Sequence, residues 1–94
     1  MVENVASAAQ AIRGDTNGTG YAIYGQSTGT RAAIGGSGGD TARGAVFISN
    51  VAQLRLQPST RTTHPASGAA GDLFVDTSKR LWFCKGGSAW VQLA

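Results

Sequence analysis

The chain has 94 residues, of which 41% are hydrophobic, 14% are charged and 14 are glycines, and its net charge is +3. Glycine is about twice as frequent as the ~7% of an average protein. A chain this small and glycine-rich buries a modest fraction of its surface alone, so we expect it to oligomerise. The charges are scattered, which argues against nucleic-acid binding. No apolar run approaches ~18 residues, which argues against a transmembrane helix. The single cysteine excludes a disulfide within the chain. The first residues also lack the pattern of a signal peptide.

The first segment, residues 1–13, has apolar residues at positions 2, 5, 9 and 12, spaced by 3, 4 and 3. This is the a/d spacing of a coiled coil, and Gly14 would end such a helix. The run covers fewer than two heptads. Two interpretations therefore stay open, a short helical stalk and a frayed terminus.

Residues 14–57 form a repeat segment. The motif Ala-Ile-X-Gly begins at residues 11, 22 and 33, a constant step of eleven, and a shifted apolar copy begins at residue 45. The apolar cores suit strands, and the spacers consist of Gly, Asn, Asp, Ser and Thr, which form turns. Each copy is therefore predicted to be a short strand and a turn, and residues 45–57 to be two strands with a break near residues 49–50. A fixed period indicates stacked units and favours a structural or binding role over catalysis.

Each repeat supplies about one large aliphatic side chain to an inner face. One such residue per layer cannot close a core within one chain, whereas three chains around an axis bring three isoleucines together, and burying each contributes roughly 1.5–3 kcal/mol. We therefore predict a homotrimer, with a two-sided solenoid made by one chain as the competing geometry. The predicted trimer core consists of Ile12, Ile23, Ile34, Val46, Ile48, Leu73, Val75, Leu81, Phe83 and Trp90.

Residues 58–70 contain Pro58, Pro65 and Gly68 and are predicted to be a polar connector that separates the repeats from the C-terminal residues. In residues 71–94, short apolar runs at 73–75, 80–84 and 89–93 alternate with turn residues at 76–79 and 86–88. Short strands joined by short turns predict an antiparallel β-meander. Both tryptophans lie here, so neighbouring chains of a trimer are expected to cover this unit, which would clamp the trimer.

The run Gly-Asp-Leu-Phe-Val-Asp at residues 71–76, then Leu-Trp-Phe-Cys at 81–84 and a closing tryptophan at 90, resembles a terminal module of bacterial and phage fibre-like proteins. The Ala-Ile-Tyr-Gly repeats resemble the Gly-Val-Tyr-Gly-type repeats that often precede it, although Gly35 replaces the usual aromatic. The resemblance covers residues 11–48 and 71–94. It implies an intertwined homotrimeric β-helix or β-prism of a tail fibre or tailspike, in a virion or at an extracellular surface. The implied partners are further copies of the chain, other fibre or virion proteins and cell-surface glycans.

The expected function is a structural fibre segment that trimerises and rigidifies the assembly. The alternative is a glycan- or receptor-binding tip for host attachment, with Tyr21, Tyr24 and Trp82 as candidate contacts, although core packing is another use for Trp82. In a strand, Tyr21 would share a face with Ile23, and Tyr24 would lie on the other face. Threonines at positions 19, 30 and 41 keep the same step and leave a small ice-binding face as a further alternative.

No catalytic, cofactor or metal site is predicted, and the chain is not expected to be an enzyme. One histidine and one cysteine do not supply the three or four protein ligands of a zinc site, and Cys84 is expected to be buried as a small apolar residue. Asp72 and Asp76 are expected to cap turns and to pair with Lys79 or Arg80 rather than to bind a cation. No two carboxylates stand at a spacing that suggests glycoside hydrolysis.

Overall fold

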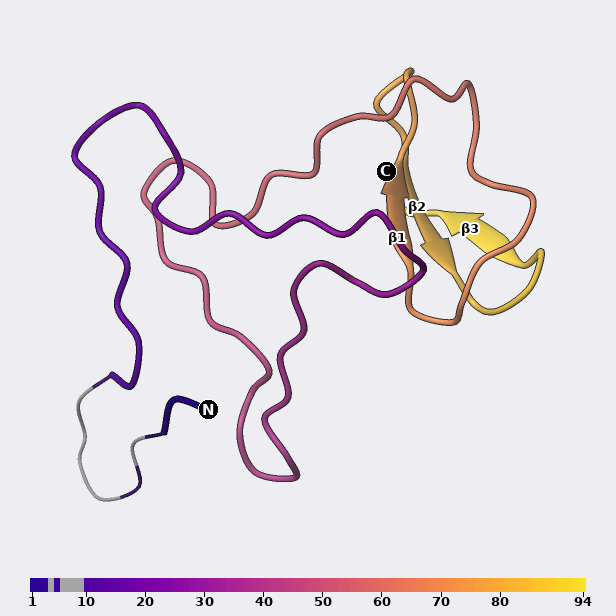
Figure 1. The fold of residues 1–94 in the computed structure, drawn as a ribbon. Helices are drawn as coiled ribbons and strands as arrows, with labels where there is room; N and C mark the ends of the chain where they lie inside the picture. The colour runs from indigo at the N-terminus through magenta and orange to yellow at the C-terminus, as the bar shows by residue number, and fades with distance from the viewer. Residues whose placement is uncertain (4, 6–9) are drawn as a thin grey trace. The chain divides into compact units, whose positions relative to one another are not determined.

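The regular secondary structure lies near the C-terminus. The computed structural model describes residues 1–3, 5 and 10–94 and divides the chain into two units, Met1–Ala45 and Val46–Ala94. The second unit contains the strands β1 (Leu73–Val75), β2 (Leu81–Cys84) and β3 (Trp90–Gln92), which form one antiparallel sheet in the order β1-β2-β3 (Figure 1). No helix occurs in the described residues. The regular structure is thus all-β, and the meander predicted for residues 71–94 is present.

Two tight turns connect the three strands. Between β1 and β2, the backbone N–H of Lys79 donates to the carbonyl oxygen of Asp76 at 2.9 Å, and Lys79 has a positive φ of 66°. Between β2 and β3, Gly86 and Gly87 have φ values of 121° and 58°. Glycine adopts these values without a steric penalty, which explains why Gly-Gly stands at this turn.

The register of the strands sorts their side chains onto two faces. Phe74 lies opposite Trp82, and Cys84 lies opposite Trp90. Because side chains alternate along a strand, these four residues share one face, which we call the covered face. Leu93 continues β3 and donates its N–H to the carbonyl oxygen of Leu81 at 2.7 Å. The opposite face, which we call the open face, consists of Leu73, Val75, Leu81, Phe83, Val91 and Leu93.

A segment that precedes the sheet supplies the packing on the covered face. The His64 ring lies edge-on to Trp82, with centroids 4.6 Å apart, and stacks on Trp90 at 5.2 Å. Gly68 approaches the second indole so closely that a Cβ there would lie 2.7 Å from Cζ2 of Trp90. The same glycine forms an antiparallel bridge with Gly87. The small core of this unit therefore lies between the sheet and residues 64–68.

Residues 58–70 differ from the separating connector that the sequence predicts. The backbone N–H of Ser59 donates to the carbonyl oxygen of Val75 at 2.8 Å, and that of Thr77 donates to the carbonyl oxygen of Arg61 at 2.8 Å. In Figure 1 this segment loops beside the sheet before it enters β1. Its polar side chains do not prevent it from pairing, because the backbone groups at the edge of β1 need hydrogen-bond partners.

In the first unit, the repeat consists of three loops that close over the same number of residues. Each loop begins at a glycine that lies against the carbonyl oxygen of the residue eight positions later: Gly14 against Ala22, Gly25 against Ala33 and Gly36 against Gly44. A Cβ at these glycines would lie 3.2, 3.3 and 2.9 Å from those oxygens. The glycines therefore permit a close approach of two backbone segments. The eleven-residue step of the sequence is kept in three dimensions.

The predicted strands of residues 14–57 are not present as paired strands in the single chain. Instead, side-chain hydroxyls hold turns inside the first two loops. Thr16 Oγ1 accepts the backbone N–H of Gly18 at 3.1 Å, and Ser27 Oγ accepts that of Gly29 at 3.3 Å, again eleven residues apart. A strand needs a neighbouring strand for its backbone groups, and the apolar runs of three or four residues do not pair with one another within one chain.

The stalk predicted for residues 1–13 falls partly outside the described residues, because Asn4 and residues 6–9 are not described. The described residues on either side of them are not helical. The helix therefore stays a prediction.

Candidate functional site

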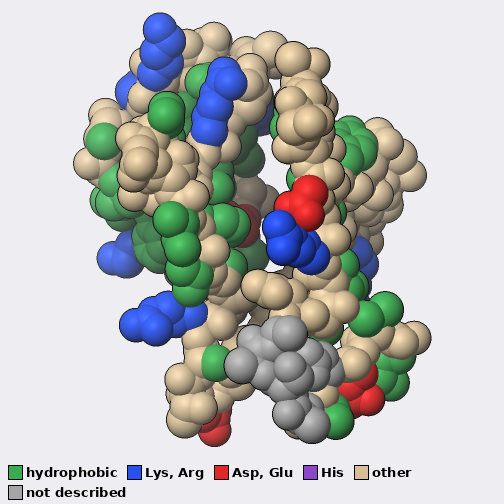
Figure 2. Space-filling view, turned by 90° about the vertical axis from the view of Figure 1, so that its left-hand side faces the viewer, with side chains coloured by type: hydrophobic (Ala, Val, Ile, Leu, Met, Phe, Trp, Pro, Cys, Tyr) green, Lys and Arg blue, Asp and Glu red, His purple; other side chains and the backbone are tan. Residues whose placement is uncertain are grey.

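Most of the large hydrophobic side chains are exposed, and Figure 2 shows such side chains on one face. Among the described residues, Cys84 is the only buried hydrophobic one, as the sequence predicts for this cysteine. The candidate functional site is therefore an interaction surface.

The first part of this surface is the array of isoleucines in the repeats. Ile12, Ile23 and Ile34 are 68%, 66% and 71% exposed. A Cβ at Gly14 would lie 2.8 Å from Cγ1 of Ile23, and a Cβ at Gly25 would lie 2.9 Å from Cγ1 of Ile34. Ile23 and Ile34 thus occupy the same position in successive loops. Val46 and Ile48, which belong to the predicted trimer core and lie in the shifted copy of the repeat, are also exposed.

The second part is the open face of the sheet. Leu73, Val91 and Leu93 are 50%, 43% and 56% exposed, and the other three members of the face are partly exposed. Four predicted trimer-core residues lie together here: Leu73, Val75, Leu81 and Phe83. Val91 and Leu93 also lie on this face and are not among the predicted core residues, although their alternation with Trp90 is a signal for this position.

Trp90 lies on the other side of the sheet from these residues. It is opposite Cys84 in the register, and its ring packs against His64 and, edge-on, against Phe74 with centroids 6.3 Å apart. Its indole Nε1 is buried and has no hydrogen-bond partner among the described residues. The structure thus places Trp90, which the sequence assigns to a trimer core, in the core of its own chain.

The three aromatic residues predicted to contact glycans have different surroundings. Tyr21 and Tyr24 are 83% and 69% exposed, and their rings stack with centroids 5.9 Å apart and an interplanar angle of 25°. The sequence places these rings on opposite faces of a strand, but the chain bends at residues 22–23, which brings rings three positions apart together. Trp82 is half-buried, because His64 packs against its ring and the carboxylate of Asp76 binds its Nε1.

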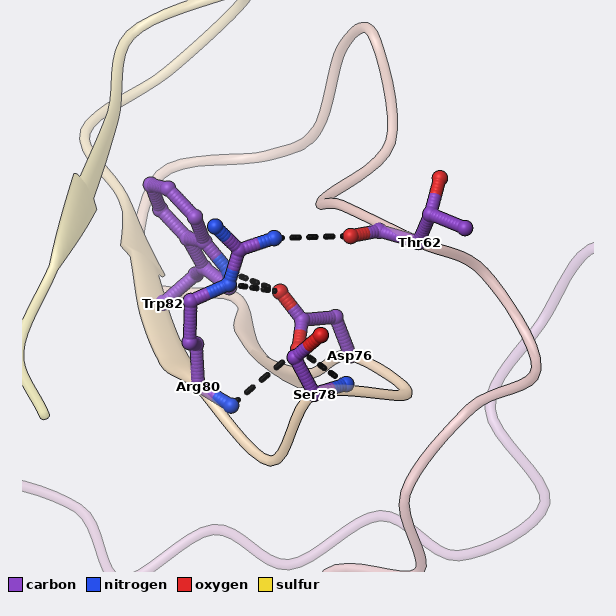
Figure 3. A network of polar contacts seen from close by, with 5 residues as sticks. All are labelled: Thr62, Asp76, Ser78, Arg80 and Trp82. Carbon is purple, nitrogen blue, oxygen red and sulfur yellow. Dashed lines mark hydrogen bonds and ion pairs between the residues drawn. The ribbon is translucent and has the colours of Figure 1, made fainter.

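A buried carboxylate connects the first turn of the meander to the covered face (Figure 3). Oδ2 of Asp76 accepts Nε1–H of Trp82 at 2.9 Å and Nε–H of Arg80 at 2.7 Å. Oδ1 accepts the backbone N–H groups of Ser78 and Arg80 at 2.9 and 3.1 Å. Arg80 also donates to the carbonyl oxygen of Thr62 at 2.7 Å. The predicted turn cap and the predicted pairing of Asp76 with Arg80 are confirmed.

These contacts decide the charge of Asp76. Burial raises the pKa of this carboxyl, but hydrogen bonds from the Trp82 indole and from the backbone and side chain of Arg80, together with the positive charge of Arg80, lower it. The net effect places the pKa of Asp76 below its ordinary value of 3.8. The Arg80 guanidinium also lies 5.4 Å from the centroid of the Trp82 ring, within the range of a cation–π contact. Both oxygens are thus engaged in holding the turn, which indicates a structural role.

Neither a pocket nor a group of three His, Cys, Asp or Glu side chains able to hold a metal ion is found in the described ranges. None of the described segments forms a helix long and apolar enough to cross a membrane. Comparison with protein-family models, with curated proteins and with solved structures gives no significant match to this chain. The exposed apolar surfaces are therefore the features of this chain that bear on its function.

Proposed function

We propose that the chain is a structural segment of a fibre, in which three copies assemble around a common axis and make the fibre rigid. The observation that carries the proposal is the regular array of exposed isoleucines in equivalent loops, with Ile23 and Ile34 66% and 71% exposed. One such side chain per loop has too few apolar neighbours in its own chain, whereas three copies would enclose each other's isoleucines. Full burial of each contributes roughly 1.5–3 kcal/mol.

One further observation supports assembly over a monomeric solenoid. The three loops follow one another at the constant sequence step of eleven residues, which identical chains can match without a change of register. In this proposal, the trimer is an intertwined β-helix or β-prism, and the apolar runs of the repeats find strand partners in neighbouring chains.

The meander serves as the clamp of the proposed trimer. Its core is made within one chain, since His64 packs on Trp82 and Trp90, whereas the repeat isoleucines have no such core. Structures with local contacts form faster than those that depend on distant pairing. The meander would therefore fold first and present three chains to each other in register.

The wider setting is proposed from the sequence resemblance to fibre-like proteins. The chain would belong to a phage tail fibre or a similar filament, in a virion or at an extracellular surface, next to other fibre or virion proteins. The proposal assigns it no catalytic step, no cofactor and no role in nucleic-acid binding or membrane insertion.

The proposal is tested by the mass of the chain in solution, measured by light scattering over a range of concentrations. The expected mass is three times the 9.6 kDa of one chain. Ile23→Asp should abolish assembly, because it would bring three carboxylates together in an apolar environment. Thr30→Asp introduces the same charge at an exposed position outside the isoleucine array and is the matched control. A monomeric mass at all concentrations, or an unchanged trimer in Ile23→Asp, would contradict the proposal.

A second candidate function, a glycan- or receptor-binding tip, is favoured by one observation. The stacked and exposed rings of Tyr21 and Tyr24 form a flat aromatic surface, the kind of surface on which sugar rings stack. Trp82 is a weaker candidate contact because its ring and its Nε1 are already engaged. Binding on a glycan array that Tyr21→Ala and Tyr24→Ala both abolish, with the mass unchanged, would support this function. An array without any binding would count against it.

A further inference from the structure

A turn of the first loop places an asparagine directly before a glycine. Asn17 and Gly18 are both exposed, and they lie in residues 15–20, a spacer between two apolar runs. The backbone N–H of Gly18 donates to Oγ1 of Thr16 at 3.1 Å, which is a bond inside the turn. Because a hydroxyl holds such a turn only weakly, this nitrogen is free to approach the neighbouring side-chain amide of Asn17.

The same kind of hydroxyl-held turn occurs at two other places with different residues. The turn of residues 27–29 is Ser-Thr-Gly, and its serine Oγ accepts the glycine N–H at 3.3 Å. The turn of residues 49–51 is Ser-Asn-Val, and its serine Oγ accepts the valine N–H at 3.1 Å. One of these turns therefore has the glycine without the asparagine, and the other has the asparagine without the glycine. Of the three turns, the one at residues 16–18 combines both.

The residue after the asparagine decides how easily the backbone nitrogen reaches the side-chain amide. Glycine has no Cβ and adopts backbone conformations that other residues avoid, so the nitrogen of Gly18 can turn toward Cγ of Asn17. Val51 is branched at Cβ, which makes it stiffer and crowds the approach to Asn50. Both asparagines are exposed in turns of the same type. The following residue is thus the main difference between the two sites.

We propose that Asn17 is a site of spontaneous deamidation, at which the side-chain amide becomes a carboxylate. A hydroxide ion from the solvent removes the proton of the Gly18 N–H, and the nitrogen forms a bond to Cγ of Asn17. The bond between Cγ and Nδ2 breaks, and ammonia leaves with a proton from water, which regenerates hydroxide. Water then opens the cyclic imide at either carbonyl and gives aspartate or isoaspartate, with no oxidation or reduction.

The conversion changes the first loop in two ways. It adds a negative charge close in sequence to Asp15, whose carboxylate pairs with Arg13 at 2.9 Å. The isoaspartyl product also routes the backbone through the side-chain carbon, which lengthens the loop that closes between Gly14 and Ala22. The inference is independent of the proposed function, because the chemistry needs only an exposed turn, which the proposed trimer also leaves between its strands.

The two asparagines are compared within one sample of the full chain. The chain is incubated in a mildly alkaline buffer and digested at intervals, and mass spectrometry of the peptides detects the replacement of the amide –NH₂ by –OH. Conversion should be at least about tenfold faster at Asn17 than at Asn50, which corresponds to a barrier lower by about 1.4 kcal/mol. Equal rates would overturn the inference. A rate at Asn17 more than about tenfold below that of the same chain in urea would also overturn it, since the folded turn would then protect the amide.

Two variants move the site in opposite directions. Thr28→Asn gives the second loop the same pair of residues in a turn of the same type, and the new amide should convert about as fast as Asn17. Gly18→Val should slow the conversion of Asn17 to the rate of Asn50, and a Cβ at Gly18 meets only Oγ1 of Thr16, at 3.7 Å, so the turn has room for it. A Thr28→Asn chain without a second site, or a Gly18→Val chain that reacts as fast as the wild type, would overturn the inference.

Discussion

The indole of Trp82 and the carboxylate of Asp76 are joined by a hydrogen bond of 2.9 Å, although one belongs to β2 and the other to the preceding turn. The same carboxylate oxygen accepts Nε–H of Arg80 at 2.7 Å. The bond fixes the indole edge-on to His64, whose ring also stacks on Trp90. A turn, a strand and the preceding loop segment are thus coupled through one buried carboxylate.

The stability of the meander should depend on pH in the acid range. The folded-state pKa of Asp76 is lowered relative to its ordinary value of 3.8, so the unfolded chain binds a proton more readily than the folded chain. The resulting stabilisation is complete above the unfolded pKa and is lost as the pH falls through the folded pKa. Urea unfolding followed by tryptophan emission should show a falling midpoint below about pH 4.

Asp76→Asn is the control for this prediction. The variant should be less stable than the wild type at neutral pH, because it weakens the contacts with Arg80 and Trp82. Its midpoint should change much less between about pH 5 and pH 2. A variant with the same acid dependence as the wild type would show that Asp76 does not cause the effect.

Gly68→Ala should destabilise the meander strongly, although the substitution adds a single methyl group. The added Cβ would lie 2.7 Å from Cζ2 of Trp90, 3.1 Å from Oδ2 of Asp72 and 3.2 Å from Sγ of Cys84. Overpacking of this kind costs about 1–3 kcal/mol. Ser67→Ala, at the exposed neighbouring position, is the control and should leave the free energy of unfolding almost unchanged. Equal unfolding midpoints for the two variants would contradict the close packing of Gly68 on the indole.

In the repeats, two glycine substitutions should differ in their effect on the proposed trimer. A Cβ at Gly25 would lie 2.9 Å from Cγ1 of Ile34 and 3.3 Å from the carbonyl oxygen of Ala33, whereas a Cβ at Gly20 would have no neighbour within 4 Å. Gly25→Ala should therefore lower the dissociation temperature of the assembly, measured by light scattering on heating. Gly20→Ala should leave it unchanged or raise it slightly, because alanine lowers the conformational entropy of the unfolded chain and thereby stabilises the folded chain by about 0.4–1 kcal/mol. Identical behaviour of the two would argue against the closed loops.

A fourth prediction concerns the smallest fragment that keeps the core of the meander. Residues 58–94 contain the sheet together with His64 and Gly68, which pack on the tryptophans. This fragment should retain the near-UV circular dichroism of the tryptophans, and residues 71–94 alone should lose most of it. Equal spectra for the two fragments would show that residues 58–70 do not contribute to the core.

Much of the local structure can be read from the sequence. The eleven-residue step predicts equivalent units, and the loops closed at Gly14 and Gly25 keep that step. Turn residues between short apolar runs predict the three strands, because Gly86 and Gly87 adopt positive φ at little cost. The pairing of Asp76 with Arg80 follows from their proximity in the first turn. These features depend on residues that are close in sequence, where backbone geometry and side-chain chemistry leave few choices.

Tertiary structure alone decides which face of the sheet is covered. Alternation places Val91 and Trp90 on opposite faces, but it does not say which of them lies in the core of the chain. That depends on His64, whose packing against the tryptophans is a contact between segments distant in sequence. In the same way, polar residues 58–70 were predicted to separate two parts, whereas their backbone pairs with the sheet through Ser59 and Arg61. The composition of a segment describes only its side chains. The partners of its backbone hydrogen bonds depend on which sheet edge lies beside the segment in the folded chain.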